Sequence, residues 1–319
     1  MTTREIIDKL IESNKIGITC HVSPDGDSLG SSLALLQVLL KLGKDAYIIS
    51  KESLPKDFSY LPYSNEFNKQ NDTVLENTDV VIVLDCGNTD RINGNINLEE
   101  KQYTLINIDH HLSNDLYGDM NYIDTKAAAV AEIVYEILVG LNLQLDKNIA
   151  TCLYTSLVTD TGSFRHSNTT LNTHKIAGIL ITTGMDFTEI HRILFENKSL
   201  SRIKLYGKVI DNMEMFLNDK LCIMYLNKNI LGESEENKGD TSDIITIGTQ
   251  IDSVEVTALI KETEQGAKVS LRSKNVVDVR KIAEEFQGGG HVRAAGFSIN
   301  ENVYNIKNIL IKKVENELI

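Results

Sequence analysis

The chain has 319 residues, of which 42% are hydrophobic and 24% are charged, and its formal net charge is −13. These values are typical of a folded globular protein, and the length predicts about two domains. The acidic balance argues against a long nucleic acid as a partner, because proteins that bind a long phosphate backbone present many basic side chains. No apolar run reaches the roughly 20 residues of a membrane helix, and the opening amphipathic segment lacks the apolar core of a signal peptide. We therefore expect a cytoplasmic protein with no membrane partner.

The four cysteines are far apart in the sequence and form no CxxC pair. Such spacing is typical of neither a disulfide framework nor a zinc ribbon. We therefore expect reduced thiols in the core at Cys20, Cys86, Cys152 and Cys222.

Apolar strands alternate with amphipathic helices over the first 160 residues. Short runs rich in valine and isoleucine between helices are typical of a buried parallel sheet. The pattern therefore predicts a doubly wound α/β domain. The expected strands lie at 16–20, 45–50, 79–85 and 103–109, and the expected helices lie at about 28–42, 127–139 and 147–159.

The second half of the chain has a different pattern. A long helical pattern follows residues 182–186 and continues to about Phe216, after which 221–227 has the pattern of a strand. Two β-rich runs around residues 264–266 predict an antiparallel hairpin. A helix at 277–286, a glycine-rich loop, the strand AAGFSI and a terminal helix are expected after it.

These patterns divide the chain into three parts: an N-terminal domain over 1–185, a helical connector over 186–217 and a C-terminal domain over 218–319. The expected fold class is α/β, with a doubly wound, mainly parallel sheet in the first domain and a smaller α/β second domain. A chain of this length has room for a cleft between the two domains.

Ionisable residues stand where three of the predicted strands end. Ligands of open α/β sheets bind at the carboxyl ends of the strands, so these side chains should meet at one edge of the sheet. A further carboxylate stands at the end of an apolar helix, which Gly162 can break. The residues of this cluster are His21, Asp25, Asp27, Asp85, Asp109, His110, His111 and Asp160.

Several of these residues also have an ordinary structural explanation. Asp25 and Asp27 could form a turn around Gly26, and Asp85 could cap a turn. Two adjacent imidazoles beside a carboxylate at a strand end are harder to explain by packing, so the cluster as a whole favours a functional site. Lone histidines are more often structural. We give that interpretation to His166, His174 and His191.

The ligand types in the cluster predict the kind of metal. Carboxylates and imidazoles without a thiolate suit Mn²⁺, Mg²⁺ or Fe²⁺ better than a structural zinc ion. One aspartate such as Asp85 can bridge two ions about 3.5–4 Å apart, and a bridging hydroxide can then attack a phosphoryl group. Two divalent ions would offset most of the negative charge of the aspartates. We therefore expect two metal ions per chain.

Six segments in order resemble the motifs of one enzyme family. In the first domain, HVSPDGDSLGSSLAL, VIVLDCG, NIDHH and SLVTDTGSF resemble the signature motifs of the DHH phosphoesterases. In the second, SLRS (270–273) and GGGHVRAAGF (288–297) resemble the DHH-associated C-terminal domain. By size and domain pairing, the chain is similar to bacterial nanoRNases that also act as 3′-phosphoadenosine 5′-phosphate phosphatases.

The resemblance implies a role for each residue of the cluster. Asp85 would bridge the two ions, His111 would face the scissile phosphate and Asp109 would orient a metal-bound imidazole, which makes these three the expected catalytic residues. The chain departs from the pattern at 127–129, where it has three alanines and relatives often carry a pair of hydroxyl residues. The expected ligands are His21, Asp25 and Asp85 for one ion, and Asp27, Asp85, His110 and Asp160 for the other.

The resemblance also implies that the second domain binds the phosphate or base of the substrate. Backbone N–H groups of a glycine-rich turn can approach a phosphate closely, and histidine and arginine add charge. The expected substrate-binding residues are Arg272, Ser273, Gly288, Gly289, Gly290, His291 and Arg293.

The function that the resemblance implies is that of a Mn²⁺-dependent phosphohydrolase. It would degrade very short oligoribonucleotides to mononucleotides and dephosphorylate 3′-phosphoadenosine 5′-phosphate, with Mg²⁺ or Fe²⁺ as other candidate ions. An alternative with the same fold is a phosphodiesterase for linear diadenylate or cyclic di-AMP. An alternative of another class is a nucleotide-binding regulator without turnover, which the loss of a ligand would favour. Whether the chain forms a homodimer stays open.

Overall fold

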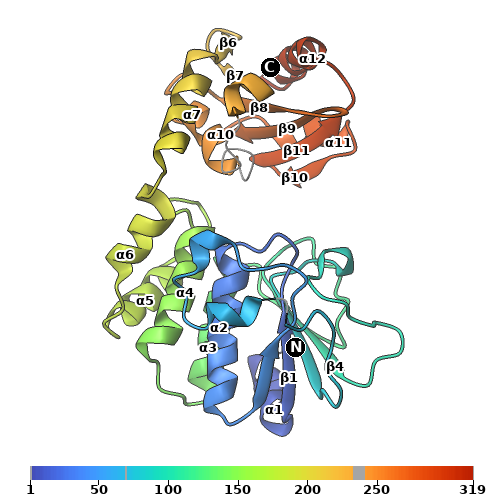
Figure 1. Ribbon diagram of the computed structural model, residues 1–319, viewed down its shortest axis with the longest axis vertical. Coiled ribbons are helices and arrows are strands. Elements are labelled where there is room, and N and C mark those ends of the chain that lie inside the picture. Colours follow the sequence, from blue (N-terminus) through green and yellow to red (C-terminus); the bar gives the residue numbers. More distant parts are fainter. Residues whose placement is uncertain (1, 69, 233–240, 319) are drawn as a thin grey trace. The chain divides into compact units, whose positions relative to one another are not determined.

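The computed structural model describes residues 2–68, 70–232 and 241–318. The chain divides into two compact units, Met1–Asn197 and Lys198–Ile319, each with a sheet and its own helices (Figure 1). The division lies inside the segment predicted as a connector. Within the described ranges, no helix combines the length and the apolar character needed to cross a bilayer.

The N-terminal unit is built on a five-stranded sheet in which all strands are parallel, in the order β2-β1-β3-β4-β5. The strand order reverses between β1 and β3, which is the switch point where such sheets bind ligands. The strands are β1 Lys15–Thr19, β2 Asp45–Ile48, β3 Val80–Leu84, β4 Thr104–Asp109 and β5 Met120–Ile123. Four confirm predicted strands; the sequence pattern misses β5 because it is short and only half-buried.

The side chains of this sheet alternate between two apolar clusters. Val80 and Ile82 face the helices, whereas Val81 and Val83 face the opposite side, where loop residues such as Ile92 cover the sheet. The predicted fold class is confirmed, with the difference that loops and not helices cover this second face. The helices of the first cluster are α1 Thr3–Glu12, α2 Gly26–Lys41, α3 Val130–Gly140, α4 Lys147–Asp160 and α5 Leu171–Ile181.

Helix α2 packs closely against α4 (Figure 1). Two glycines one turn apart in α2 permit this approach. A Cβ on Gly30 would lie 2.4 Å from the carbonyl oxygen of Cys152, and a Cβ on Gly26 would lie 2.4 Å from the side chain of Thr159. The close approach brings Asp27, which lies between the glycines, against α4.

The C-terminal unit has a six-stranded sheet in the order β10-β11-β9-β8-β7-β6, in which only the β7–β8 pair is parallel. The predicted hairpin is confirmed, because residues 264 and 265 join β8 to β9. The strands are β6 Glu214–Phe216, β7 Leu221–Leu226, β8 Val256–Thr263, β9 Gly266–Ser273, β10 Gly289–His291 and β11 Ala294–Ile299. The helices are α7 Leu200–Asp211, α8 Lys228–Leu231, α10 Ser242–Thr249, α11 Val279–Glu284 and α12 Val303–Glu317.

The long helix predicted to reach Phe216 is wrong as a single element. Helix α6, Phe187–His191, passes into a π-helical turn, Arg192–Glu196, and the helix then stops. The hydroxyl of Ser199 accepts a hydrogen bond from the N–H of Arg202 at 3.1 Å, so α7 begins there as a new, capped helix. The end of the predicted helix forms β6 instead, because pairing with β7 satisfies its backbone groups.

The glycine-rich segment is a strand and not the predicted loop, since β10 pairs with β11. A Cβ on Gly290, whose φ is +138°, would lie 2.4 Å from the carbonyl oxygen of Ala294. A Cβ on Gly288 would lie 2.3 Å from that of Gly296. Packing therefore requires these two glycines, whereas a Cβ on Gly289 would have no neighbouring atom within 4 Å.

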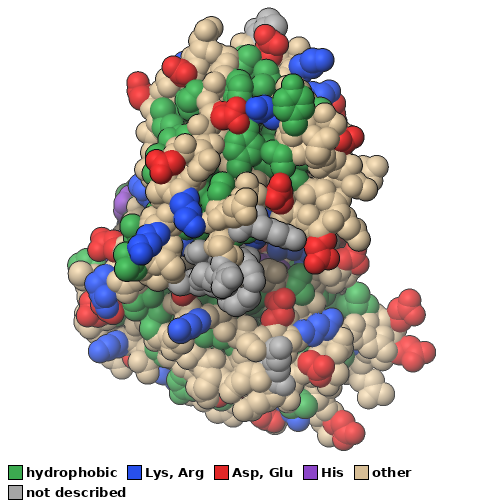
Figure 2. Space-filling view, turned by 45° about the horizontal axis from the view of Figure 1, so that its top comes forward, with side chains coloured by type: hydrophobic (Ala, Val, Ile, Leu, Met, Phe, Trp, Pro, Cys, Tyr) green, Lys and Arg blue, Asp and Glu red, His purple; other side chains and the backbone are tan. Residues whose placement is uncertain are grey.

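The C-terminal unit also contains a cavity of about 430 Å³ whose lining includes Tyr225, Tyr304 and Lys307. On the face drawn in Figure 2, apolar side chains gather on this unit and charged side chains of both signs border them. The residues predicted to bind substrate do not belong to the described lining of the cavity. The cavity and the predicted substrate-binding residues are therefore separate features of this unit.

Gly30→Ala should destabilise the protein by roughly 1–3 kcal/mol, because the added methyl group would overlap the α4 backbone at Cys152. Gly178→Ala in α5 is the matched control: a Cβ there meets no atom within 4 Å, and the change should stabilise by up to about 1 kcal/mol. Urea unfolding measures both effects. An unchanged stability of Gly30→Ala would contradict the close α2–α4 approach.

Candidate metal centre

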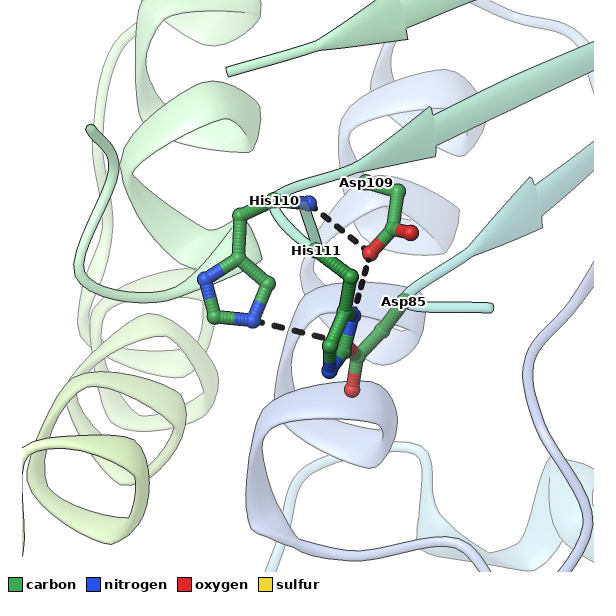
Figure 3. Close-up of side chains that lie close together, drawn as sticks. All are labelled: Asp85, Asp109, His110 and His111. Carbon is green, nitrogen blue, oxygen red and sulfur yellow. Dashed lines mark hydrogen bonds and ion pairs between the residues drawn. The ribbon is translucent and has the colours of Figure 1, made fainter. Parts of the chain in front are cut away.

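The ionisable residues predicted at the strand ends meet at the carboxyl edge of the parallel sheet. Their possible ligand atoms form three groups, and the atoms of each group all lie within 4.8 Å of one another. Figure 3 shows the side chains of one group converging from the ends of β3 and β4. The groups are Asp85, Asp109, His110 and His111; His21, Asp25 and Asp85; and Asp27, His110 and Asp160. Every predicted member of the cluster therefore belongs to a group.

His21 presents one ring nitrogen to two carboxylates. Its Nδ1 atom lies 2.9 Å from the carbonyl of Val22 and 3.4 Å from Nη2 of Arg91; because the carbonyl is the closer partner and only accepts, Nδ1 holds the proton. The other nitrogen, Nε2, lies 3.6 Å from Oδ1 of Asp25 and 3.4 Å from Oδ2 of Asp85. Asp25 is the N-cap of α2 and accepts from the N–H of Ser28 at 3.1 Å, which fixes its position.

His110 is arranged in the same way. Its Nδ1 atom donates to the carbonyl of Ala127 at 3.1 Å. Its Nε2 atom faces three carboxylates, at 3.7 Å from Asp27, 3.6 Å from Asp85 and 3.5 Å from Asp160. The ligand atoms of Asp27, His110 and Asp160 lie within 4.8 Å of one another, and His110 also faces Asp85.

Asp85 belongs to both arrangements. Its Oδ2 atom faces His21 and its Oδ1 atom faces His110. The backbone has φ of +54°, an uncommon conformation for a residue with a side chain, and such strain is typical of functional sites. Oδ1 is buried and accepts no hydrogen bond within the described part of the chain. A buried carboxylate oxygen without a donor is costly, and a divalent cation would offset that cost, so the residues fit a metal site.

Asp27 is the most extensively hydrogen-bonded of the expected ligands. It is 1% exposed, and its Oδ1 atom accepts from the hydroxyls of Ser31 at 3.0 Å and Ser156 at 2.5 Å. Its Oδ2 atom accepts from the N–H of Val130 at 2.9 Å. The N-cap of α3 is Ala129, whose side chain cannot accept a hydrogen bond, so the carboxylate of Asp27 takes over the capping of this helix.

Asp109 lies against His111 and not against the ring of His110. The Nδ1 atom of His111 donates to Asp109 Oδ1 at 2.7 Å, and the backbone N–H of His110 donates to the same oxygen at 2.8 Å. Asn114 donates to the other oxygen at 2.6 Å. Asp109 therefore orients the ring of His111. From the sequence, we expected it to orient an imidazole that binds a metal ion.

The buried charges shift the pKa values of the cluster. Burial, reinforced by neighbouring aspartates, raises the pKa of Asp27 to about 7 and that of Asp160 to about 8. Burial lowers the pKa of His21 and His110, but the surrounding carboxylates outweigh it and raise both pKa values to about 10. Without a metal ion, the cluster therefore holds protons at neutral pH that a cation would displace.

Sequence reasoning missed several side chains that hold the residues of the cluster, among them Ser31, Ser156 and Asn114. Ser31 is four residues after Asp27 and Ser156 is four residues before Asp160, so helical spacing alone sets each on the same face as a ligand. Asn114 lies in an irregular loop and has no such periodic signal. The four cysteines are buried thiols, as predicted.

In the C-terminal unit, two predicted substrate residues share one row of the sheet. Ala294 of β11 pairs with Arg272 on one side and with His291 on the other. Directly paired residues of antiparallel strands point to the same face, so the small side chain of Ala294 separates two basic ones. The Nη1 atom of Arg272 donates to the carbonyl of Leu271 at 3.0 Å.

Two other predicted substrate residues hold the loop that follows β9. Ser273 donates to the carbonyl of Val277 at 2.6 Å, and Arg293 donates to the carbonyls of Val277 and Asn275. Glu255, which sequence reasoning missed because it belongs to no motif, accepts from the N–H groups of residues 275, 276 and 277 at 2.9, 2.6 and 3.1 Å. These contacts fix the loop beside Arg272.

The sequence motifs and this geometry agree with the family comparison. Residues 15–157 match the N-terminal domain of the DHH family, and residues 218–318 match the DHHA1 domain. The chain belongs to the DHH phosphoesterase family, which confirms the resemblance derived from its motifs.

Individual relatives cover most of the chain. The bifunctional oligoribonuclease and PAP phosphatase NrnA of Thermus thermophilus is 32% identical, over 89% of this chain and 84% of its own length. The protein with that description from Bacillus subtilis is 30% identical, over 88% of this chain and 87% of its own length. The crystal structure of an exopolyphosphatase-related protein from Bacteroides fragilis is 25% identical, with a TM-score of 0.88, over 98% of this chain and 95% of that one.

Metal binding should release protons, because metal ligands must be deprotonated and the raised pKa values of His21, Asp27, His110 and Asp160 leave these four groups wholly or partly protonated near pH 7 in the metal-free chain. The affinity for Mn²⁺ should therefore rise from about pH 6 to about pH 9, with more than one proton released per chain near pH 7. Calorimetry in buffers of different ionisation enthalpy counts these protons. An affinity that stays constant over this range would contradict the assignment of the cluster as the metal site.

Proposed function

We propose that this chain is a two-metal phosphohydrolase that degrades very short oligoribonucleotides to mononucleotides and dephosphorylates 3′-phosphoadenosine 5′-phosphate. The observation that carries the proposal is Asp85, whose two oxygens face two separate sets of ligands. The descriptions of the two NrnA relatives support the substrate class. Carboxylate and imidazole ligands support Mn²⁺, with Mg²⁺ or Fe²⁺ as alternatives.

We assign the metals to the N-terminal unit. When bound, the two ions would stabilise the negative charge that develops on the phosphoryl group. The ligands would be His21, Asp25 and Asp85 for one ion, and Asp27, Asp85, His110 and Asp160 for the other. Because no member of this set is missing from the cluster, nothing favours a regulator without turnover.

His111 is the residue we assign to the scissile phosphate. Its Nδ1 atom holds a proton against Asp109, and this bond fixes the plane and tautomer of the ring. The second nitrogen, Nε2, is then the atom through which the ring can contact a phosphoryl oxygen. Asp109, itself held by Asn114, is a positioning residue for this imidazole.

The C-terminal unit is the part we assign to the rest of the substrate. Arg272 and His291 project from one face of the sheet, and Arg272 can bind a phosphate through several N–H groups. The backbone of Gly289 has no side chain to keep a phosphate away. Ser273 and Arg293 would act by holding the adjoining loop.

Asp85→Asn should reduce kcat/KM at least about 100-fold with the fold intact, because an amide supplies only one oxygen and no negative charge to a shared position. Asp90→Asn is the matched control, since Asp90 is exposed in a nearby turn outside the cluster. Both variants are assayed with Mn²⁺ on 3′-phosphoadenosine 5′-phosphate, linear diadenylate and RNAs of increasing length. Turnover near that of the wild type would refute the bridging role, and a rate that climbs with RNA length would refute the short-substrate assignment.

Arg272→Ala should raise KM for a dinucleotide about 10- to 150-fold, the cost of losing a charge-assisted hydrogen bond. The hydrolysis of p-nitrophenyl phosphate, which is too small to need this contact, should change little. Lys268→Ala is the control, because Lys268 lies on the same face of β9 and is exposed. Equal losses on both substrates would assign Arg272 to the chemical centre instead.

A further inference from the structure

Two ligands expected for one ion are tied directly to the same stretch of backbone, residues 127–130, which we call the alanine segment. The carbonyl of Ala127 accepts from Nδ1 of His110 at 3.1 Å. The N–H of Val130 donates to Oδ2 of Asp27 at 2.9 Å. The three alanine side chains are buried, so the segment contacts these ligands through its backbone.

A third ligand, Asp160, is joined to the alanine segment by Asn168. The Nδ2 atom of Asn168 donates to the carbonyl of Ala128 at 3.0 Å and to the carbonyl of Asp160 at 3.2 Å. Because both neighbours are acceptors, the NH₂ group and not the oxygen of the amide has to face them. Its two hydrogens match the two carbonyls.

The end of α4 explains why Asp160 needs such a contact. Asp160 is the last residue of the helix, so no N–H group of the helix donates a hydrogen bond to its carbonyl. Gly162 and Ser163, with φ of +54° and +61°, turn the chain back toward this end. The returning loop supplies Asn168, and also Nδ1 of His166 at 3.3 Å from the same carbonyl.

We propose that Asn168 is a positioning residue for the metal ligand Asp160. By bonding both carbonyls, it holds the end of α4 at the distance from the alanine segment at which Asp160 reaches within 3.5 Å of His110 Nε2. The inference rests on the proposed function, because it requires that Asp160, His110 and Asp27 hold one ion. Loss of Asn168 should then weaken the binding of that ion and leave the affinity for the ion held by His21 and Asp25 unchanged.

Asn168→Leu tests this role, because leucine keeps the branched shape of the side chain and removes both hydrogen bonds. Calorimetric titration with Mn²⁺ should give two ions, one with the wild-type affinity and the other bound about 10- to 100-fold more weakly. Asn172→Leu is the matched control, since Asn172 donates to Glu132 at 2.9 Å and to no expected ligand. Its two affinities should equal those of the wild type.

A second background identifies the affected ion. His21→Ala removes a ligand of the other ion. In this background, adding Asn168→Leu should lower the affinity for the ion that is still bound. In His110→Ala, adding Asn168→Leu should change nothing further. If Asn168→Leu does not fold, Asn168→Ser replaces it, because a hydroxyl has one hydrogen and cannot donate to both carbonyls.

Two wild-type affinities in Asn168→Leu, or an equal loss in Asn172→Leu, would overturn the role of Asn168 and leave the proposed function standing. A wild-type chain that binds fewer than two Mn²⁺ ions would overturn the proposed function itself. Thermal unfolding of the metal-free variants separates both results from a general loss of stability.

Discussion

The arrangement of the N-terminal unit depends on carboxylates buried at one edge of a parallel sheet. Asp27 and Asp85 are 1% and 3% exposed, so water cannot solvate their charges. The chain compensates Asp27 with three donors, from Ser31, Ser156 and the backbone of Val130. It offers no such donor to Oδ1 of Asp85 within the described residues, and burial raises the pKa of the nearby carboxyl groups of Asp27 and Asp160 to about 7 and about 8. The pair of divalent ions that we propose would offset this negative charge at the point where the two sets of expected ligands meet.

Contacts with neighbouring helices and backbone groups fix the positions of the expected ligands. Glycines in α2 allow the contact with α4 that brings Asp27 to Ser156. In the alanine segment, the carbonyl of Ala127 accepts a hydrogen bond from His110, and the N–H of Val130 donates to Asp27, which caps α3. Asn168 joins the same segment to the end of α4. Because these contacts use main-chain atoms, a substitution at one of the alanines would remove no hydrogen-bonding group. It would act by shifting the backbone that holds the expected ligands.

Much of this site could be predicted because its strands are apolar runs that end in ionisable residues, as Leu84 does before Asp85. Parallel strands deliver such residues to one edge whatever the loops do. The break before α7 could not be predicted, because the residues on both sides of it form helices and a single hydroxyl, that of Ser199, begins the new one. Asn168 and Glu255 could not be predicted either, because their hydrogen-bond partners are backbone atoms, which leave no pattern in the amino-acid sequence.

The central claim is that one carboxylate serves two ions. Anomalous X-ray diffraction from crystals grown with Mn²⁺ tests it directly, because each manganese ion gives its own peak. The account predicts two peaks about 3.5–4 Å apart, the spacing of two-metal sites, with one oxygen of Asp85 directed at each. A single peak, or two peaks of which only one contacts Asp85, would contradict it.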